Sequence, residues 1–279
     1  MSIWEIVAQS GQRILQNATE RLQLRLPTDP VPDQWHDILA RNVPLARPLS
    51  PPDRDRLLQV ARLLMHEVPF EGCQGLVVTD EIRVTIAATA ALLLYRLPYP
   101  RFTKLVRVLI YPDTFVPVKV ESRRDAMVIE SEPSLGQAWM NGVVVLSWAG
   151  IRQDAADSSV RGNVILHEMA HILDAEDGSF DGTPILEDSS QGPDWARVLT
   201  REFARQREAV DAGADPPLDE YAARNTAEFF AVATEAFYCS PDRLRSRLPE
   251  LYAQLQRFFR HTPTAATAPT QLASRPASV

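Results

Sequence analysis

Hydrophobic residues recur at helical spacing, every three or four positions, in several separate stretches of the chain. The segments for which this spacing predicts a helix are 4–24, 51–65, 81–95, 164–174, 195–210, 226–239 and 244–260. Two of these segments follow a residue type that favours a helix start, because Ser50 precedes adjacent prolines and Asn225 precedes the sixth segment. The pattern therefore predicts a protein built mainly from helices.

β-Branched and aliphatic side chains dominate a few shorter segments, which are predicted to be strands. These segments are 105–111 and 142–148, with weaker candidates at 116–120 and 126–130. Residues 70–75 are predicted to form a turn, and the proline-rich stretch 27–52 is predicted to be largely irregular. A few short strands among many helices indicate an α+β fold with a small sheet.

The predicted elements with large hydrophobic residues lie mostly between residues 35 and 261, where we expect one domain. Residues 1–34 are expected to form an N-terminal helix and a proline-rich lead-in. Residues 262–279 are rich in threonine, alanine, proline and serine, and we expect them to form a disordered tail because they offer little to pack.

The composition of the 279 residues, 45% hydrophobic and 23% charged, is typical of a soluble globular protein. A net charge of −7 argues against binding to nucleic acid or to an anionic membrane surface. The cysteines, Cys73 and Cys239, are too few for a disulfide framework. The first residues show no signal-peptide pattern, and the most apolar run, 86–95, is too short to span a bilayer. We therefore expect a cytoplasmic location.

The helical segment 164–174 contains the pattern H-E-x-x-H, formed by His167, Glu168 and His171. Residues four positions apart lie one turn apart on the same face of a helix, so both imidazoles can bind one metal ion. A catalytic zinc site uses such a pair, a third protein ligand and an open position for water. Glu168 lies beside the first histidine, where a carboxylate can take a proton from the activated water. The pattern predicts a zinc-dependent hydrolase.

Asp174 follows His171 by three positions and lies on the predicted ligand face. One interpretation is that its carboxylate accepts the second ring N–H of a ligand histidine, as outer-shell groups commonly do. The other is that Asp174 serves only as a turn residue at the end of the helix. The sequence leaves both open.

The third metal ligand has several candidates. Glu228 lies in the first turn of the helix that follows Asn225, with large hydrophobic neighbours that would bury it. This position fits either a capping-box partner of Asn225 or a metal ligand, and we favour the ligand because two histidines still need a third. Glu187 and Asp188 are closer in sequence but fall in a predicted loop, whereas Glu235 suits an outer-shell or amine-binding role.

Several of these segments resemble the Mlc titration factor A family of zinc metallopeptidases. The resemblance rests on residues 167–178 (HEMAHILDAEDG), on Tyr221-Ala222-Ala223, and on residues 227–232 with Glu235. It extends from about residue 35 to residue 259 and includes 70–75 and 109–112. The chain is more distantly similar to the catalytic domain of anthrax lethal factor, which shares the pattern H-E-x-x-H-x-x-D.

The resemblance implies a gluzincin-type domain with a small mixed sheet, an H-E-x-x-H helix and a later helix that bears the glutamate ligand. It implies one Zn²⁺ per chain, held by His167, His171 and Glu228, with Glu168 as general base. It also implies that Tyr221 donates to the oxyanion, although a tyrosine packed with its hydroxyl satisfied is the alternative.

The function implied is that of a cytosolic peptidase with aminopeptidase-like activity on peptide substrates. The alternative is a regulatory protein that binds and sequesters a transcriptional repressor called Mlc, with the zinc site secondary. Neither function requires a nucleic acid or a membrane as partner.

Overall fold

The computed structural model describes residues 29–98, 102–113, 136–138, 142–156 and 162–264. The first described helices are α2 (Asp33–Asn42), α3 (Pro51–Glu67) and α4 (Asp80–Ala91), followed after the sheet by α5 (Trp148–Ala156) and α6 (Val164–Asp174). The last part of the fold contains α7 (Gly192–Asp211), α8 (Thr226–Cys239), α9 (Pro241–Arg247) and α10 (Pro249–Phe259). The expected N-terminal helix at 4–24, the weaker strands at 116–120 and 126–130, and most of the expected tail lie outside the described residues.

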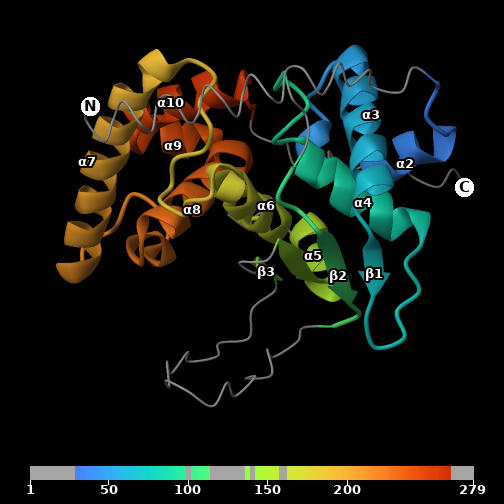
Figure 1. The fold of residues 1–279 in the computed structure, drawn as a ribbon. Helices are drawn as coiled ribbons and strands as arrows, with labels where there is room; N and C mark the ends of the chain where they lie inside the picture. The colour runs from blue at the N-terminus through green and yellow to red at the C-terminus, as the bar shows by residue number, and fades with distance from the viewer. Residues whose placement is uncertain (1–28, 99–101, 114–135, 139–141, 157–161, 265–279) are drawn as a thin grey trace, which may run out of the picture.

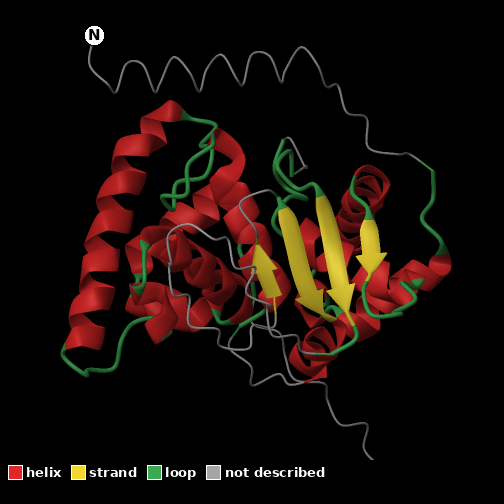
Figure 2. Cartoon of the chain, turned by 60° about the horizontal axis from the view of Figure 1, so that its bottom comes forward, coloured by secondary structure: helices red, strands yellow, loops and turns green. Residues whose placement is uncertain are grey.

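The sheet has four described strands in the order β1-β2-β4-β3. They are β1 (Phe70–Gly72), β2 (Arg107–Tyr111), β3 (Gly136–Ala138) and β4 (Val143–Ser147). The first three in this order run parallel, with Val108 opposite Val144, whereas β3 pairs with β4 in antiparallel fashion (Figure 2). The predicted α+β fold with a small mixed sheet is therefore confirmed.

Helix α6 lies in the middle of the molecule, between the sheet with α2 to α4 on one side and α7 to α10 on the other (Figure 1). Its main helical neighbours are α8 and α4. Helix α8 contributes Phe229, Phe230 and Phe237, which are fully buried. Each such side chain stabilises the fold by about 1.5–3 kcal/mol. This packing fixes α6 against α8, the two helices on which the site depends.

The helix starts that the sequence predicts at Ser50 and Asn225 are confirmed. Ser50 caps α3 by accepting a hydrogen bond from Asp53 N, and Asn225 caps α8 by accepting one from Glu228 N. Thr79 caps α4 in the same way. These caps satisfy backbone N–H groups that have no partner within the helix.

Three predictions of secondary structure were wrong. Residues 244–260 do not form one helix, because the chain breaks at Leu248, before Pro249, which lacks an N–H and disfavours helical backbone at the preceding residue. Residues 70–72 form strand β1, not only a turn, because β2 offers them a pairing edge. The stretch 27–52 contains α2, since its prolines flank residues 33–42 and do not interrupt them.

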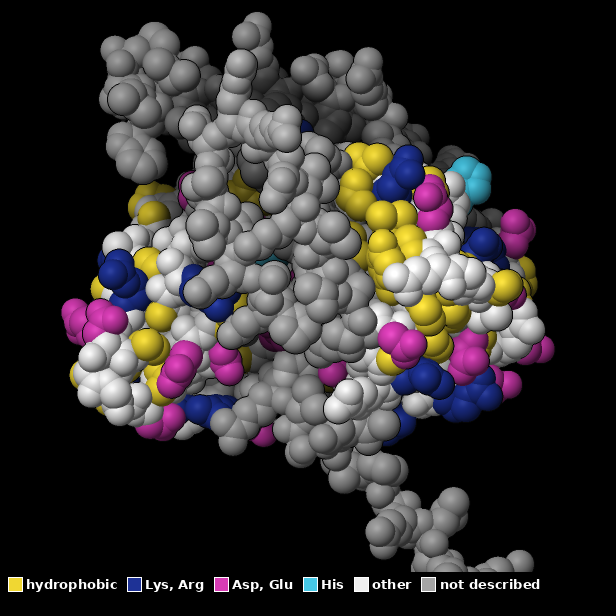
Figure 3. Space-filling model, turned by 90° about the horizontal axis from the view of Figure 1, so that it is seen from below, with side chains coloured by type: hydrophobic (Ala, Val, Ile, Leu, Met, Phe, Trp, Pro, Cys, Tyr) yellow, Lys and Arg dark blue, Asp and Glu magenta, His cyan; other side chains and the backbone are white. Residues whose placement is uncertain are grey.

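The surface seen from below carries interspersed acidic and basic side chains around a hydrophobic area (Figure 3). Large hydrophobic residues that are exposed among the described ones are Val77, Val106, Phe180 and Tyr221. No helix within the described ranges has the length and apolar character needed to cross a membrane.

Candidate metal centre

Helix α6 carries two of the ligand candidates. Asn163 starts the helix by accepting a hydrogen bond from Leu166 N, and the apolar residues of α6 are buried against the core. His167 and His171 therefore share the remaining face, where their Nε2 atoms lie 3.2 Å apart. Both side chains are largely buried, with 15% and 13% of their surface exposed.

Helix α8 brings Glu228 to the same point from the other side. The Asn225 cap fixes the first turn of α8, and Glu228 Oε2 lies 3.1 Å from His167 Nε2 and 3.2 Å from His171 Nε2. Asn225 Oδ1 accepts the hydrogen bond from Glu228 N, but the Glu228 carboxylate contacts the two histidines and Tyr221 and forms no described hydrogen bond with Asn225 N, which a capping box requires. The contacts of the carboxylate therefore fit the ligand interpretation and not the capping box.

The three atoms form a nearly equilateral triangle that fits a tetrahedral zinc ion. Ligand atoms bound at about 2.0–2.1 Å in tetrahedral geometry lie about 3.3 Å apart, close to the observed separations. Within the described part of the chain, these three residues form the one group of histidine, cysteine or carboxylate side chains that are close enough together to hold a metal ion. The donor chemistry, two imidazoles and one carboxylate, is that of a catalytic zinc site.

Glu235, two turns after Glu228 on α8, contacts the ring nitrogen of His167 that faces away from the other ligand candidates. Its Oε1 lies 2.6 Å from His167 Nδ1, and its Oε2 accepts a hydrogen bond from Asn163 N at 2.7 Å. The contact orients the ring so that Nε2 faces Glu228. A Cβ at Gly162 would lie 2.6 Å from Glu235 Oε2, so a larger residue there would require this carboxylate to shift from its present position.

Glu168 and Tyr221 adjoin the triangle. Glu168 follows His167 on α6 and is only 4% exposed, and its charge adds a small contribution to the raised pKa of His167 and of Tyr221. The Tyr221 hydroxyl donates to Glu228 Oε1 at 3.3 Å, and its ring packs edge-on against His167 at 5.9 Å. Burial and the charge of Glu228 raise the pKa of Tyr221, so its phenol keeps its proton at neutral pH.

The two ligand types influence each other's protonation. Burial alone would lower the pKa of His167, but hydrogen bonds with Glu228 and Glu235 outweigh it and raise the pKa to about 10. Burial alone would raise the pKa of Glu228, but the hydrogen bonds with His167 and His171 hold it well below its usual range. In the absence of metal, a proton on the imidazole thus compensates the ionised carboxylate.

Asp174 does not support a histidine, which corrects the outer-shell interpretation. Its carboxylate is fully buried and accepts a hydrogen bond from Gly182 N at 2.9 Å. No hydrogen bond of the described residues joins Asp174 to His171, and His167 lies about 10 Å away along the helix axis, too far for contact. It fastens the following loop to the end of α6. Burial raises the pKa of Asp174 to about 7.

The loop candidates for the third ligand lie away from the centre. Glu187 pairs with Arg260 and Asp188 pairs with Arg257 at 3.0 Å, both on the side of α10. Neither residue belongs to the group of donor atoms around His167 and His171.

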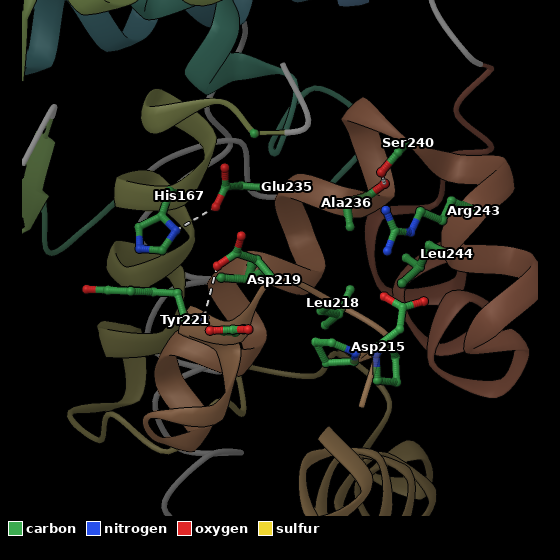
Figure 4. Close-up of a pocket in the computed structure, with 15 residues that line it drawn as sticks. His167, Asp215, Leu218, Asp219, Tyr221, Glu235, Ala236, Ser240, Arg243 and Leu244 are labelled. Atoms are coloured by element: carbon green, nitrogen blue, oxygen red, sulfur yellow. Dashed lines mark hydrogen bonds and ion pairs between the residues drawn. The ribbon is translucent and has the colours of Figure 1, made fainter. Parts of the chain in front are cut away.

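A pocket of about 650 Å³ adjoins the metal centre and extends toward α9 (Figure 4). Its lining includes His167, Tyr221 and Glu235 at one end and Ser240 and Arg243 at the other. The sequence analysis did not single out Arg243, and it missed Gly162 and Asn163. Asn163 could have been found as a polar residue directly before an apolar helix. The other two contribute only through contacts with distant parts of the chain.

Comparison with protein-family models matches residues 16–260 to the family described as glucose-regulated metallo-peptidase M90. An uncharacterized protein of Synechocystis sp. is 34% identical over 236 residues, which cover 82% of this chain and 84% of the relative. Proteins named Mlc titration factor A from Yersinia pestis and Yersinia pseudotuberculosis are 35% identical over 237 residues, or 83% of this chain and 86% of theirs.

Proposed function

Because the chain belongs to the glucose-regulated metallo-peptidase M90 family, we propose that it is a zinc-dependent peptidase with aminopeptidase-like specificity that acts in the cytoplasm. In this proposal residues 35–261 form the peptidase domain. The observation that carries the proposal is the triangle of His167 Nε2, His171 Nε2 and Glu228 Oε2, with sides of 3.1–3.2 Å, beside the buried Glu168. A purely structural zinc site would need no carboxylate next to its ligands.

His167, His171 and Glu228 would hold the metal, which we propose is zinc. When bound, the metal supplies Lewis acidity that polarises the scissile carbonyl and lowers the pKa of a nearby water. Glu168 takes the proton from the attacking water and later transfers it to the leaving amine. The phenol of Tyr221, protonated at neutral pH, donates a hydrogen bond to the oxyanion that develops on the substrate carbonyl.

Replacement of the proposed base tests this function. Glu168→Gln keeps the shape of the side chain but cannot accept a proton, so hydrolysis should fall by about 10²–10⁴-fold while zinc remains bound. The measurement is the hydrolysis of a panel of chromogenic amino-acid amides, with the zinc content determined on the same samples. Glu187→Gln, which removes a carboxylate outside the centre, is the matched control and should retain activity. Parent-like hydrolysis by zinc-loaded Glu168→Gln would refute the mechanism.

A second candidate function is regulatory binding, in which the chain sequesters a transcriptional repressor. The support is the name of the Yersinia relatives, Mlc titration factor A. The two functions differ in what Glu168→Gln does: a peptidase loses its activity, whereas sequestration measured by co-purification with the repressor would not change.

A further inference from the structure

The pocket beside the metal centre runs from α6 and α8 to α9, and its size suits a short peptide segment. Its volume of about 650 Å³ falls within the range of small-molecule sites. Figure 4 shows His167 and Glu235 on one side of it and Ser240 and Arg243 on the other, with the Arg243 side chain reaching inward from α9. A ligand that reaches the metal centre can therefore extend to Arg243.

Helix α9 carries three arginines, and two of them are already paired. Arg245 contacts Asp242 at 2.8 Å, and Arg247 contacts the Asp215 carboxylate at 2.8 Å and its backbone oxygen at 2.9 Å. Arg243 is half-buried and forms no hydrogen bond or ion pair with any residue that the structure describes. Its guanidinium thus offers five N–H donors to whatever occupies the pocket.

The carboxylates that line the pocket have other hydrogen-bond partners or face solvent, and none of them forms an ion pair with Arg243 in the described structure. Asp215 is held by Arg247, and Asp219 accepts a hydrogen bond from Tyr221 N. Glu235 is committed to the metal centre through His167, and Glu220 is exposed to solvent. Among the described residues, none of these carboxylates forms an ion pair with Arg243, so its guanidinium remains available on the α9 side of the pocket.

The lining between the two ends contains the acidic residues Asp215, Asp219 and Glu220 as well as apolar side chains. The apolar ones are Pro216, Pro217, Leu218, Val232, Ala236 and Leu244. Both kinds of side chain disfavour a negative charge in the middle of a bound ligand, whereas the Arg243 guanidinium at the α9 end favours an anionic group there. A guanidinium binds a carboxylate through two parallel hydrogen bonds, which gives both affinity and direction.

We propose that this pocket is a specificity subsite that binds a carboxylate group of the peptide substrate through Arg243. The carboxylate belongs to the peptide's C-terminus or to an aspartate or glutamate side chain. The Ser240 hydroxyl is a second donor, because its bond to the Ala236 carbonyl is long, 3.4 Å, and easily exchanged. That the ligand is a peptide rests on the proposed function.

Binding of matched peptides to a form that cannot cleave them tests the subsite. The zinc-loaded Glu168→Gln protein is titrated calorimetrically with Ala-Ala-Ala and its C-terminal amide, and with Ala-Glu-Ala-amide and Ala-Gln-Ala-amide. At least one carboxylate peptide should bind about 10–100-fold more tightly than its neutral partner, as expected for hydrogen bonds to charged groups. The pair that shows the difference identifies the source of the carboxylate.

Adding Arg243→Gln should bring this ratio to about one, whereas Arg243→Lys, which keeps the charge but loses the fork, should retain part of it. Arg245→Gln removes an exposed arginine from the same helix and should leave the ratio unchanged. Circular dichroism verifies that each variant is folded. Equal binding of carboxylate and neutral peptides, no binding of any peptide, or a preference that survives in folded Arg243→Gln would overturn the proposal.

The outcome is separable from that of the proposed function. A binding preference without turnover by the intact protein would support the carboxylate subsite and contradict the peptidase. Equal hydrolysis of peptides with and without the carboxylate would support the peptidase and contradict the carboxylate subsite.

Discussion

At the level of single residues, a proton and a metal ion compete for the imidazole of His167. Without metal, Glu228 and Glu235 favour the imidazolium and raise the pKa of His167 to about 10. A metal ion needs the neutral ring, so it must displace that proton. The carboxylate of Glu228 requires no such step, because its pKa lies well below the usual range. Metal affinity is therefore tied to pH through His167.

The expected result is that apparent zinc affinity rises about tenfold per pH unit between about pH 7 and 9, as the proton on His167 becomes easier to displace. The direction follows from the raised pKa. Because the imidazole holds its proton tightly, the proton competes with the metal ion more strongly as the pH falls. Competition against a chromogenic chelator, corrected for the chelator's own protonation, measures the slope. An affinity that stays flat across this range would mean that His167 is neutral before zinc arrives.

At the level of secondary structure, the end of α6 depends on Asp174. The Asp174 carboxylate accepts a hydrogen bond from Gly182 N. The Gly182 carbonyl in turn accepts a hydrogen bond from Trp195 Nε1 of α7 at 3.2 Å. The pair of contacts ties the loop after α6 to both helices. The role is structural, and it lies away from the ligand atoms.

Asp174→Ala should lower the free energy of unfolding by about 1–3 kcal/mol, because a buried N–H then lacks its acceptor. Zinc stoichiometry at saturating metal should not change. Urea denaturation and metal analysis of the same protein distinguish this result from an outer-shell role, for which zinc affinity would fall by about 10–100-fold at little cost in stability.

The sequence predicted those parts of the fold that depend on local signals. The cap at Asn225 and the i, i+4 spacing of His167 and His171 are written in neighbouring residues, and both are confirmed in the structure. The pairing of Glu235 with His167 spans 68 positions, and it depends on how α8 packs on α6. The environment of Arg243 likewise results from tertiary packing, so no local pattern reveals it.

At the level of the whole molecule, a bound metal would join α6 to α8 across the core. Anything that binds only the folded state stabilises it, by about 2.7–4.1 kcal/mol when zinc exceeds its Kd by about 100–1,000-fold. For a chain of this size that corresponds to an increase in Tm of about 5–15 °C. Chelation should reverse the increase.

Glu228→Ala should abolish most of this thermal shift, because the remaining histidines leave the ion with only two protein ligands. Glu187→Ala, on the side of α10, should shift like the parent. Scanning calorimetry with and without zinc provides the measurement. A full shift in Glu228→Ala together with its loss in Glu187→Ala would transfer the ligand role to the loop.

The order in which the donor atoms are synthesised follows from their positions in the chain. Both histidines belong to one helix, whereas Glu228 comes 57 positions after His171. At translation rates of about 5–20 residues per second, the growing chain presents the imidazoles for about 3–11 seconds before the carboxylate exists. During this interval a metal ion finds only two ligands, and α6 has no α8 to pack against. The complete set of three ligands is therefore available to a metal ion only late in synthesis, after most of the chain has been made.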